Sequence, residues 1–326
     1  MKKITINEVA KVANVSIATV SRVINGDPKV LDSTRKKVLK VVQELGYSSE
    51  PYAKRLALKK DLRIGVVVSS RIKGLIEDST DEFYNVILRS IYKHKNRERC
   101  KIEECLPEDL PTKEFDGIII LGSELKRNVL KDILSSGEPV VLVDHYEPGL
   151  DIDSIVTDGY GGAIKAVNYL LMKGMKRIVH IHGPLERFGF KNRFDGYIAA
   201  MEKAGYIPKA YEANDVIGDM GTLVRYILAT YGKPDGIFVS NDYMAMKVIE
   251  GLKSNDLRVP DDISVIGFDD IIAAELFDPP LTTVKTFKIE MGYLAMERLL
   301  DKIFKESVHP VRISLFSELV IRKSTR

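Results

Sequence analysis

The stretch INEVAKVANVSIATVSRVING, residues 6–26, predicts two short helices joined by a tight turn. Apolar residues at helical spacing indicate a first helix over Ile6–Ala13 and a second over Ile17–Ile24. Residues 14–15 form the turn, and Ser16 is a good N-cap because its hydroxyl can accept a hydrogen bond from a backbone N–H of the first turn. This pattern is typical of a helix-turn-helix, which places its second helix in the major groove of DNA.

The second helix has an inward and an outward face. The inward residues are Val20, Val23 and Ile24. On the outward face, Arg22 can offer a bidentate fork to guanine, whereas the apolar Ile17 and Ala18 can read only thymine methyl groups or shape. We therefore predict these three as base contacts. Short donors suited to phosphate oxygens are Thr5, Ser16, Thr19, Ser21 and Asn25. Capping or solvation remains an open role for each hydroxyl.

A third helix completes a small all-α head over residues 1–47. It is predicted to begin with Asp32 or Ser33 as its cap, to run to about Leu45, and to end at Gly46 as a C′ glycine. Its buried face carries Val38, Leu39, Val42 and Leu45. A helical hairpin that only packs a core is the alternative interpretation.

Residues 48–61, SSEPYAKRLALKKD, predict a linker that is too short to be a stable helix alone. The motifs VANVSIATVSRVING (12–26), Leu45-Gly46-Tyr47 and PYAKRL (51–56) together resemble the LacI family of bacterial transcription regulators. The resemblance implies a hinge helix that orders only on DNA. Its minor-groove residues would be Ala53, Lys54, Arg55 and Leu56, with Leu56 as the wedge and Ala53 at the approach of the paired helices. The family usually has Asn-Ala where this chain has Glu50-Pro51, and a flexible charged tether is the alternative.

Charge is distributed unevenly along the 326 residues. The net charge is +3, yet residues 1–60 hold 13 basic and 5 acidic residues, a net of +8, and the remainder has a net of −5. A basic head on an acidic body indicates that only the head contacts a polyanion. No apolar run is long enough to span a bilayer and no signal peptide is recognisable, so we expect a cytoplasmic protein without a membrane partner. Cys100 and Cys105 fit no metal spacing and are expected to pack on or beside one strand as reduced thiols.

From residue 62 onward, short apolar runs alternate with amphipathic segments. Near-continuous apolar runs predict parallel strands covered on both faces. They are LRIGVVV (62–68), GIIIL (117–121), PVVLV (139–143), RIVHIH (177–182), GIFV (236–239) and SVIGF (264–268), with a weaker strand at CKIEECL (100–106). Helices are predicted between them, for example at Phe83–Lys95, Gly162–Lys173, Arg193–Ala204 and Tyr243–Ser254. The pattern predicts an α/β core of two doubly wound parallel-sheet subdomains over residues 62–326.

The chain is expected to cross between these subdomains more than once. Residues 153–163 look like a crossing, 282–287 look like a return, and the C-terminal segment gives one or two strands. We expect subdomain 1 to contain about 62–156 and 287–310. Subdomain 2 then contains about 157–286 and the C-terminal segment. Such a pair resembles the periplasmic sugar-binding fold, which closes a cleft on a ligand.

Polar residues that follow the apolar runs predict where the ligand cleft lies, since ligands bind outside the carboxyl ends of parallel strands. Further motifs resemble the LacI family, namely FDGIIILG (115–122), RFDGY (193–197), SNDYMAM (240–246), VPDDISVIGFDD (259–270) and PPLTTV (279–284). The resemblance implies that Arg193, Asn241 and Asp269 bind the effector from subdomain 2. Further candidates are Asp144, Phe83 and Tyr84 from subdomain 1, and Met220 as a wall where many relatives stack an aromatic ring. Helix capping, a surface ion pair and core packing are the open alternatives for these residues.

The combination predicts a sequence-specific DNA-binding regulator. The resemblance implies a repressor that binds near-palindromic double-stranded operator DNA as a homodimer and is controlled by a small sugar. Alternatives are the same regulator with a purine corepressor or a phosphoprotein partner, or a sugar sensor that does not bind DNA. An enzyme is disfavoured because the sequence has no G-x-G-x-x-G after the first strand, no P-loop and no G-x-S-x-G. His180 and His182 alternate on one strand beside the cleft, and we expect no metal, cofactor or catalytic residue.

Overall fold

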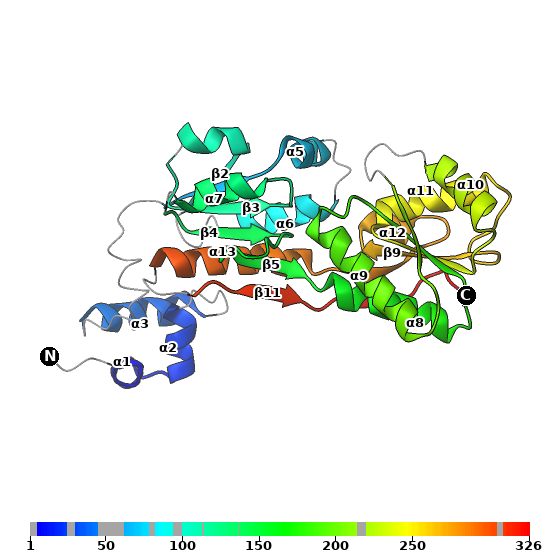
Figure 1. The fold of residues 1–326 in the computed structure, drawn as a ribbon. Helices are drawn as coiled ribbons and strands as arrows, with labels where there is room; N and C mark the ends of the chain where they lie inside the picture. The colour runs from blue at the N-terminus through cyan, green and yellow to red at the C-terminus, as the bar shows by residue number, and fades with distance from the viewer. Residues whose placement is uncertain are drawn as a thin grey trace.

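The computed structural model describes residues 5–24, 30–44, 62–77, 82–93, 100–112, 114–135, 137–213, 220–304 and 309–326. It has a small helical head and two α/β subdomains in a row, with the head beside the first subdomain and the C-terminus in the second (Figure 1). No helix in these described ranges is both long and apolar enough to cross a membrane.

The head consists of α1 (Ile6–Ala13), α2 (Ile17–Ile24) and α3 (Asp32–Glu44), so the predicted bounds of the first two helices are confirmed. Its core is formed mainly by valines and alanines from all three helices: Val9, Ala10, Ala13, Val20, Val23, Val38, Val41 and Val42. The small side chains on α1 allow close packing of the three helices. The helix α3 begins at Asp32, at the predicted start. The Asp32 side chain lies outside the described part of the structure, so its role as a cap stays a prediction.

The first sheet contains six strands in the order β11-β5-β4-β3-β1-β2, and every pair is parallel. The strands are β1 (Leu62–Val67), β2 (Cys100–Cys105), β3 (Gly117–Leu121), β4 (Val140–Val143), β5 (Asp153–Thr157) and β11 (Arg312–Leu315). Helices α5 (Ser70–Glu77), α6 (Glu82–Tyr92) and α13 (Lys288–Phe304) pack into the core on one face, and α7 (Arg127–Ser135) with the short η1 (Pro107–Thr112) on the other. Coverage on both faces explains why the central strands β1, β3 and β4 are almost continuously apolar, whereas the edge strands β2 and β11 are only partly buried.

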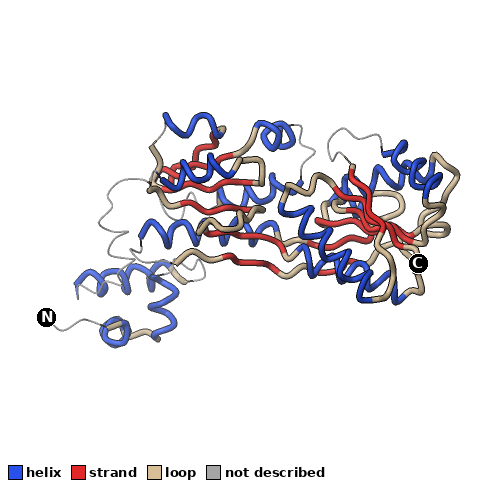
Figure 2. The backbone as a smooth tube through the Cα atoms, viewed as in Figure 1, coloured by secondary structure: helices blue, strands red, loops and turns tan. Residues whose placement is uncertain are grey.

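The second sheet has the order β12-β10-β9-β8-β6-β7, and only the edge strand β12 is antiparallel to its neighbour. Figure 2 shows the two sheets as separate sets of strands. The strands are β6 (Ile178–His182), β7 (Lys209–Glu212), β8 (Gly236–Val239), β9 (Ser264–Asp269), β10 (Thr282–Lys285) and β12 (Glu318–Val320). One face is covered by α8 (Gly159–Met172) and α9 (Phe188–Lys203), and the other by α10 (Met220–Thr230), α11 (Asp242–Lys253) and α12 (Ile272–Leu276).

The chain crosses between the sheets three times, after β5, after β10 and after β11. The predicted end of subdomain 1 at residue 310 is therefore wrong, because β11 pairs with β5 in the first sheet and the chain returns to the second sheet only after Leu315. The predicted helix start at Arg193 is also wrong, since α9 begins at Phe188. Cys100 and Cys105 lie at the two ends of β2 and are both buried, which confirms their assignment as packing residues on one strand.

Candidate functional site

The outward face of α2 carries the three residues predicted to contact bases. Ile17 is 51% exposed, and Ala18 and Arg22 are also exposed, whereas Val20 and Val23 are buried against α1 and α3. The helix therefore presents Arg22 and two apolar side chains together, as the DNA-reading prediction requires.

Several predicted phosphate contacts also have local structural roles. The Ser16 hydroxyl accepts a hydrogen bond from the Thr19 backbone N–H at 3.0 Å, so Ser16 caps α2 as predicted, and its oxygen lies 2.8 Å from the Thr19 hydroxyl. Thr5 forms a capping box with Glu8, whose carboxylate accepts from the Thr5 N–H at 2.7 Å. Thr5 and Ser16 remain exposed, and Ser21 is half-buried. Asn25 and the hinge residues Ala53, Lys54, Arg55 and Leu56 lie outside the described residues.

A cavity of about 390 Å³ is bounded by both α/β subdomains. Its described lining comprises Arg71, Leu75, Phe83, Tyr84, Ser123 and Asp144 from the first subdomain, and Arg187, Gly189, Phe190, Arg193, Asn241, Tyr243, Lys247 and Asp269 from the second. Many of these residues follow the carboxyl ends of strands, where parallel α/β sheets bind ligands. The volume is within the range of small-molecule sites.

Arg193 lies in the second turn of α9 and is only 5% exposed. Its Nη1 donates to the Ser240 carbonyl at 2.6 Å and its Nη2 to Asp269 Oδ1 at 3.2 Å. The guanidinium carbon lies 4.1 Å from the centre of the Phe268 ring. Two strand ends and an aromatic face thus hold the guanidinium in one orientation at the cavity wall, which is a buried ion pair rather than the surface pair left open by the sequence.

Asp144 follows β4 and faces the cavity from the first subdomain. Tyr84 donates its hydroxyl hydrogen to Asp144 Oδ2 at 2.8 Å. Burial raises the pKa of the Asp144 carboxyl to about 7, against the opposing effect of the Arg193 guanidinium. The carboxyl can therefore be present as an acid or as a carboxylate near neutral pH, and can donate to or accept from a ligand hydroxyl.

Asn241 and Asp269 combine a local role with a place on the cavity wall. The Asn241 side-chain oxygen accepts from the Met244 N–H at 2.8 Å, which caps α11 and leaves the amide NH₂ as a donor. Asp269 has a φ of 109°, a conformation that is costly for a residue with a side chain. Its carbonyl accepts from the Thr286 hydroxyl at 3.1 Å and from the Lys288 ammonium. These bonds fix the loop that carries the Asp269 carboxylate.

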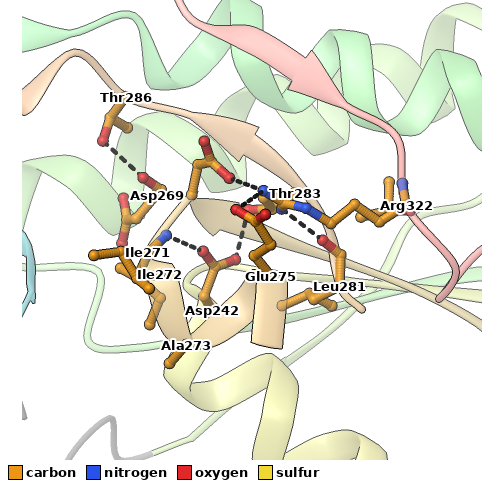
Figure 3. Close-up of polar contacts among 12 residues, drawn as sticks. Asp242, Asp269, Ile271, Ile272, Ala273, Glu275, Leu281, Thr283, Thr286 and Arg322 are labelled. Carbon is orange, nitrogen blue, oxygen red and sulfur yellow. Dashed lines mark hydrogen bonds and ion pairs between the residues drawn. The ribbon is translucent and has the colours of Figure 1, made fainter. Parts of the chain in front are cut away.

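A second carboxyl, Asp242, lies beneath that loop and is fully buried (Figure 3). It accepts from the Thr283 hydroxyl at 2.5 Å and from the Ile271 N–H at 3.0 Å. A Cβ atom at Gly267 would lie 2.2 Å from Asp242 Oδ1, so only glycine leaves room for this carboxyl. The neighbouring Asp270 accepts from Arg322 at 2.7 Å, which ties the loop to the C-terminal segment. The cavity wall is thus supported by a rigid polar network.

The two subdomains are in direct contact beside the cavity. The Glu82 carboxylate, at the start of α6, accepts from the backbone N–H groups of Ile272 and Ala273 at the start of α12. The Glu82 N–H donates to the Tyr243 hydroxyl oxygen at 3.1 Å. Because α12 has no side-chain cap of its own at Ile271, the first subdomain supplies it. The arrangement of the two subdomains is therefore coupled to groups at the cavity.

Six of the seven predicted effector residues line the cavity, and Met220 does not. Met220 is the first residue of α10 and is 4% exposed. It packs in the apolar core with residues of α10 and α11, so its prediction as a cavity wall is wrong. The sequence reasoning missed other lining residues, including Arg71, Ser123, Arg187 and Lys247. Ser123 follows β3, so the strand-end rule applied to every strand would have found it. Arg71 and Lys247 lie within helices and Arg187 lies directly before one, where no strand-end signal exists.

His180 and His182 are buried on β6, with ring centres 5.6 Å apart. His180 is stacked on Phe238 and hydrogen-bonds its carbonyl at 2.9 Å, and burial lowers its pKa to about 3. Both are packing residues behind the cavity. Among the described residues there is no cluster of three or more metal-ligating side chains.

The chain is similar to known protein families and to known regulators. Residues 5–50 match the family model for bacterial regulatory proteins of the lacI family, and residues 167–325 match that of the periplasmic binding protein-like domain. Catabolite control protein A of Priestia megaterium is 33% identical over 335 residues, which cover 99% of each chain. The chain belongs to the LacI family. It is therefore a DNA-binding transcriptional regulator and not an enzyme.

Solved structures of two transcription regulators are similar to this chain over nearly its whole length. The transcriptional regulator CelR in complex with cellobiose superimposes with a TM-score of 0.74 at 27% identity, covering 98% of this chain and 99% of that one. The Lac repressor dimer bound to operator and the anti-inducer ONPF gives a TM-score of 0.73 at 26% identity, covering 99% of each chain. The helical head and the two α/β subdomains thus have the LacI-family arrangement.

Proposed function

We propose that this protein is a cytoplasmic, homodimeric repressor that binds near-palindromic operator DNA and responds to a small sugar. The DNA-binding domain comprises residues 1–47, the hinge residues 48–61, and the effector and dimerisation core residues 62–326. Arg22, Ile17 and Ala18 read bases, while the short polar residues of the head and Asn25 contact phosphates. In the hinge, Leu56 enters the minor groove beside Ala53, Lys54 and Arg55.

The effector site is the cavity between the subdomains. Arg193, Asn241 and Asp269 bind hydroxyl groups from one side, and Asp144 with Tyr84 from the other, while Phe83 contributes an apolar wall. The observation that carries the proposal is that a fixed, buried guanidinium, two carboxyl groups and an amide converge on one cavity from both subdomains. Vicinal hydroxyl groups of a sugar require such planar and bidentate partners.

The same geometry supports a mechanism for control. A ligand that contacts both subdomains stabilises one relative arrangement of them, and the first subdomain is joined to the hinge. Effector binding then lowers operator affinity to the extent that the effector prefers the DNA-free arrangement. The contact of Glu82 with the start of α12 belongs to the arrangement described here.

A thermal-shift screen of the purified full chain tests the effector class directly. We expect one mono- or oligosaccharide to raise the melting temperature saturably, as ligand linkage requires, and then to release operator DNA in a gel-shift assay. Asp269→Ala should weaken the response without loss of DNA binding. Asp278→Asn, at a carboxylate whose side chain is 96% exposed, serves as the matched control. Stabilisation by purines alone, with no response to any sugar, would overturn the proposed effector class.

A further inference from the structure

Lys288 joins the two subdomains at the second crossing of the chain. It is the first residue of α13, a helix whose apolar face packs in the core of the first subdomain. Its side chain reaches back to the second subdomain, where the ammonium donates to the carbonyl oxygens of Asp269 and, at 3.1 Å, of Asp270. Lys288 thus connects a helix of one subdomain to the strand end of the other that carries a proposed effector residue.

The backbone that Lys288 binds has an unfavourable conformation. Asp269 has a φ of 109° and Asp270 a φ of 52°, and residues with a side chain keep such values only where their surroundings hold them. The Thr286 hydroxyl also donates to the Asp269 carbonyl, at 3.1 Å (Figure 3). The Asp269 carboxylate accepts from Arg193 at 3.2 Å at the cavity wall, and its direction therefore depends on these bonds to its backbone.

The Lys288 ammonium also lies among carboxyl groups of both subdomains. It is half-buried, and burial lowers its pKa, whereas the carboxyls of Asp269, Asp242, Asp270 and Glu82 oppose that shift. Glu82 belongs to the first subdomain and the three others belong to the second. Because Coulomb energy depends on distance, a change in the relative position of the subdomains changes the electrostatic energy of this ammonium.

Helix α13 can transmit a displacement of Lys288 across the first subdomain. It has 17 residues and is therefore about 25 Å long. Towards its C-terminal end, Arg298 and Lys302 contact the buried Asp153 carboxylate at 2.5 Å, which fixes that end to the first sheet. The helix runs from the junction of the subdomains to the end of the first subdomain beside which the helical head lies (Figure 1).

We propose that Lys288 is a positioning residue that couples effector binding at Asp269 to α13, and through α13 to the DNA-binding side of the first subdomain. This inference rests on the proposed function, because it requires Asp269 to bind the effector. An effector that bonds to the Asp269 carboxylate restrains the backbone that Lys288 holds, and the subdomains then favour a different relative arrangement. Lys288 is not one of the described residues that line the cavity, so it acts through Asp269.

The factor by which a saturating sugar changes operator affinity measures this coupling. The full chain is screened with glucose, ribose, xylose and cellobiose, and the sugar that most stabilises the wild type in a thermal-shift assay is the probe. Operator affinity is then measured by fluorescence anisotropy, without sugar and at saturation, on a DNA duplex that the wild type selects from a random pool. The plateau reports the coupling, whereas a lower sugar affinity shifts only the midpoint of the titration.

Lys288→Met tests the residue, since methionine has a similar length without a charge or a donor. In the wild type the factor should be about 5–150, the usual range of allosteric coupling, and Lys288→Met should reduce it at least about threefold. Lys285→Met is the matched control and should keep the wild-type factor. Lys285 precedes Lys288 at the same crossing, and its ammonium lies 5.7 Å from the centre of the Phe287 ring.

A conservative variant separates the coupling from a general loss of structure. Lys288→Arg keeps a positive charge and donors, and it should retain more of the wild-type factor than Lys288→Met. If Lys288→Met does not unfold cooperatively in urea, Lys288→Gln replaces it, with the same expected reduction.

The results that would count against the proposal are distinguishable. An unchanged plateau for Lys288→Met, with or without a shifted midpoint, would restrict Lys288 to a local role at the loop and overturn the coupling, while the sugar effector stands. An equal reduction for Lys285→Met would overturn the assignment to Lys288. Absence of both stabilisation and operator release with every sugar in the screen would contradict the proposed effector class and this inference together.

Discussion

The buried carboxyl of Asp242 allows the effect of burial on protonation to be tested through the pH dependence of stability. Asp242 is fully buried and accepts hydrogen bonds from Thr283 and Ile271. Burial, assisted by the nearby Asp269 carboxyl, raises its pKa from 3.8 to about 8. The perturbation is Asp242→Asn, which is neutral at every pH and has the shape of the protonated acid. Its oxygen can accept from Ile271 while its amide donates to the Thr283 hydroxyl.

The sign and size of the effect follow from proton linkage. The unfolded chain releases this proton near pH 3.8, whereas the folded chain holds it to about pH 8. The unfolded state therefore binds fewer protons between these values, and the free energy of unfolding falls as pH rises, by about 1.4 kcal/mol per pH unit for this group. From pH 5 to pH 8 the wild type should lose up to about 4 kcal/mol that Asp242→Asn retains, and above pH 8 the difference should stay constant.

Equilibrium urea unfolding at pH 5, 6, 7 and 8, followed by circular dichroism, measures this difference. Asp278→Asn controls for the loss of one exposed carboxylate, since its side chain is 96% exposed. We expect the curve of free energy against pH to be flatter for Asp242→Asn than for both the wild type and the control. Parallel curves for all three proteins would refute the argument that burial keeps this carboxyl protonated.

Four further changes test other parts of the molecule. Arg22→Ala should reduce discrimination between operator and unrelated DNA by about 1–3 kcal/mol while nonspecific, salt-dependent binding persists. Unchanged discrimination in competition gel shifts would contradict the assignment of Arg22 as a base contact. Ser16→Ala should destabilise the head by about 1 kcal/mol, as measured by local hydrogen exchange, because α2 loses its cap. Asp153→Asn removes the negative charge that Arg298 and Lys302 of α13 contact at 2.5 Å. It should lower the free energy of unfolding in urea by about 3 kcal/mol, and a decrease below about 1 kcal/mol would show that these ion pairs contribute little to stability. Glu82→Ala should change the effector concentration for half-maximal operator release roughly tenfold in either direction, since it removes two charge-assisted bonds between the subdomains; an unchanged dose response would separate this contact from control.

The helical head could be predicted from the sequence because its determinants are local. Helix bounds over Ile6–Ala13 and Ile17–Ile24 depend on neighbours three and four residues apart and on a cap formed by Ser16, all within one short stretch. Most of the buried strands were predictable for a similar reason, since a strand covered on both faces must itself be apolar. The half-exposed edge strand β7 (Lys209–Glu212) was not predicted because it has no apolar run. The order of those strands in each sheet could not be predicted. Nothing in the sequence of β11 indicates that it pairs with β5, more than 150 residues earlier, and so the end of subdomain 1 was placed too early.

The residues that line the cavity also differ in whether the sequence could predict them. Asp144, Asn241 and Asp269 could be found because each follows an apolar strand, and chain direction alone places strand ends at one edge of a parallel sheet. Lys247 and Met220 lie on helices, where the side that faces the cavity is set by how each helix packs on its sheet. That packing buried Met220 in the core and left Lys247 on the cavity wall. The sequence by itself determined the helical head, the positions of the apolar strands and the polar groups at their ends, because local spacing specifies them. Only the tertiary structure decided the strand order, the crossings and which helix residues line the cavity, because these depend on contacts between residues far apart in the chain.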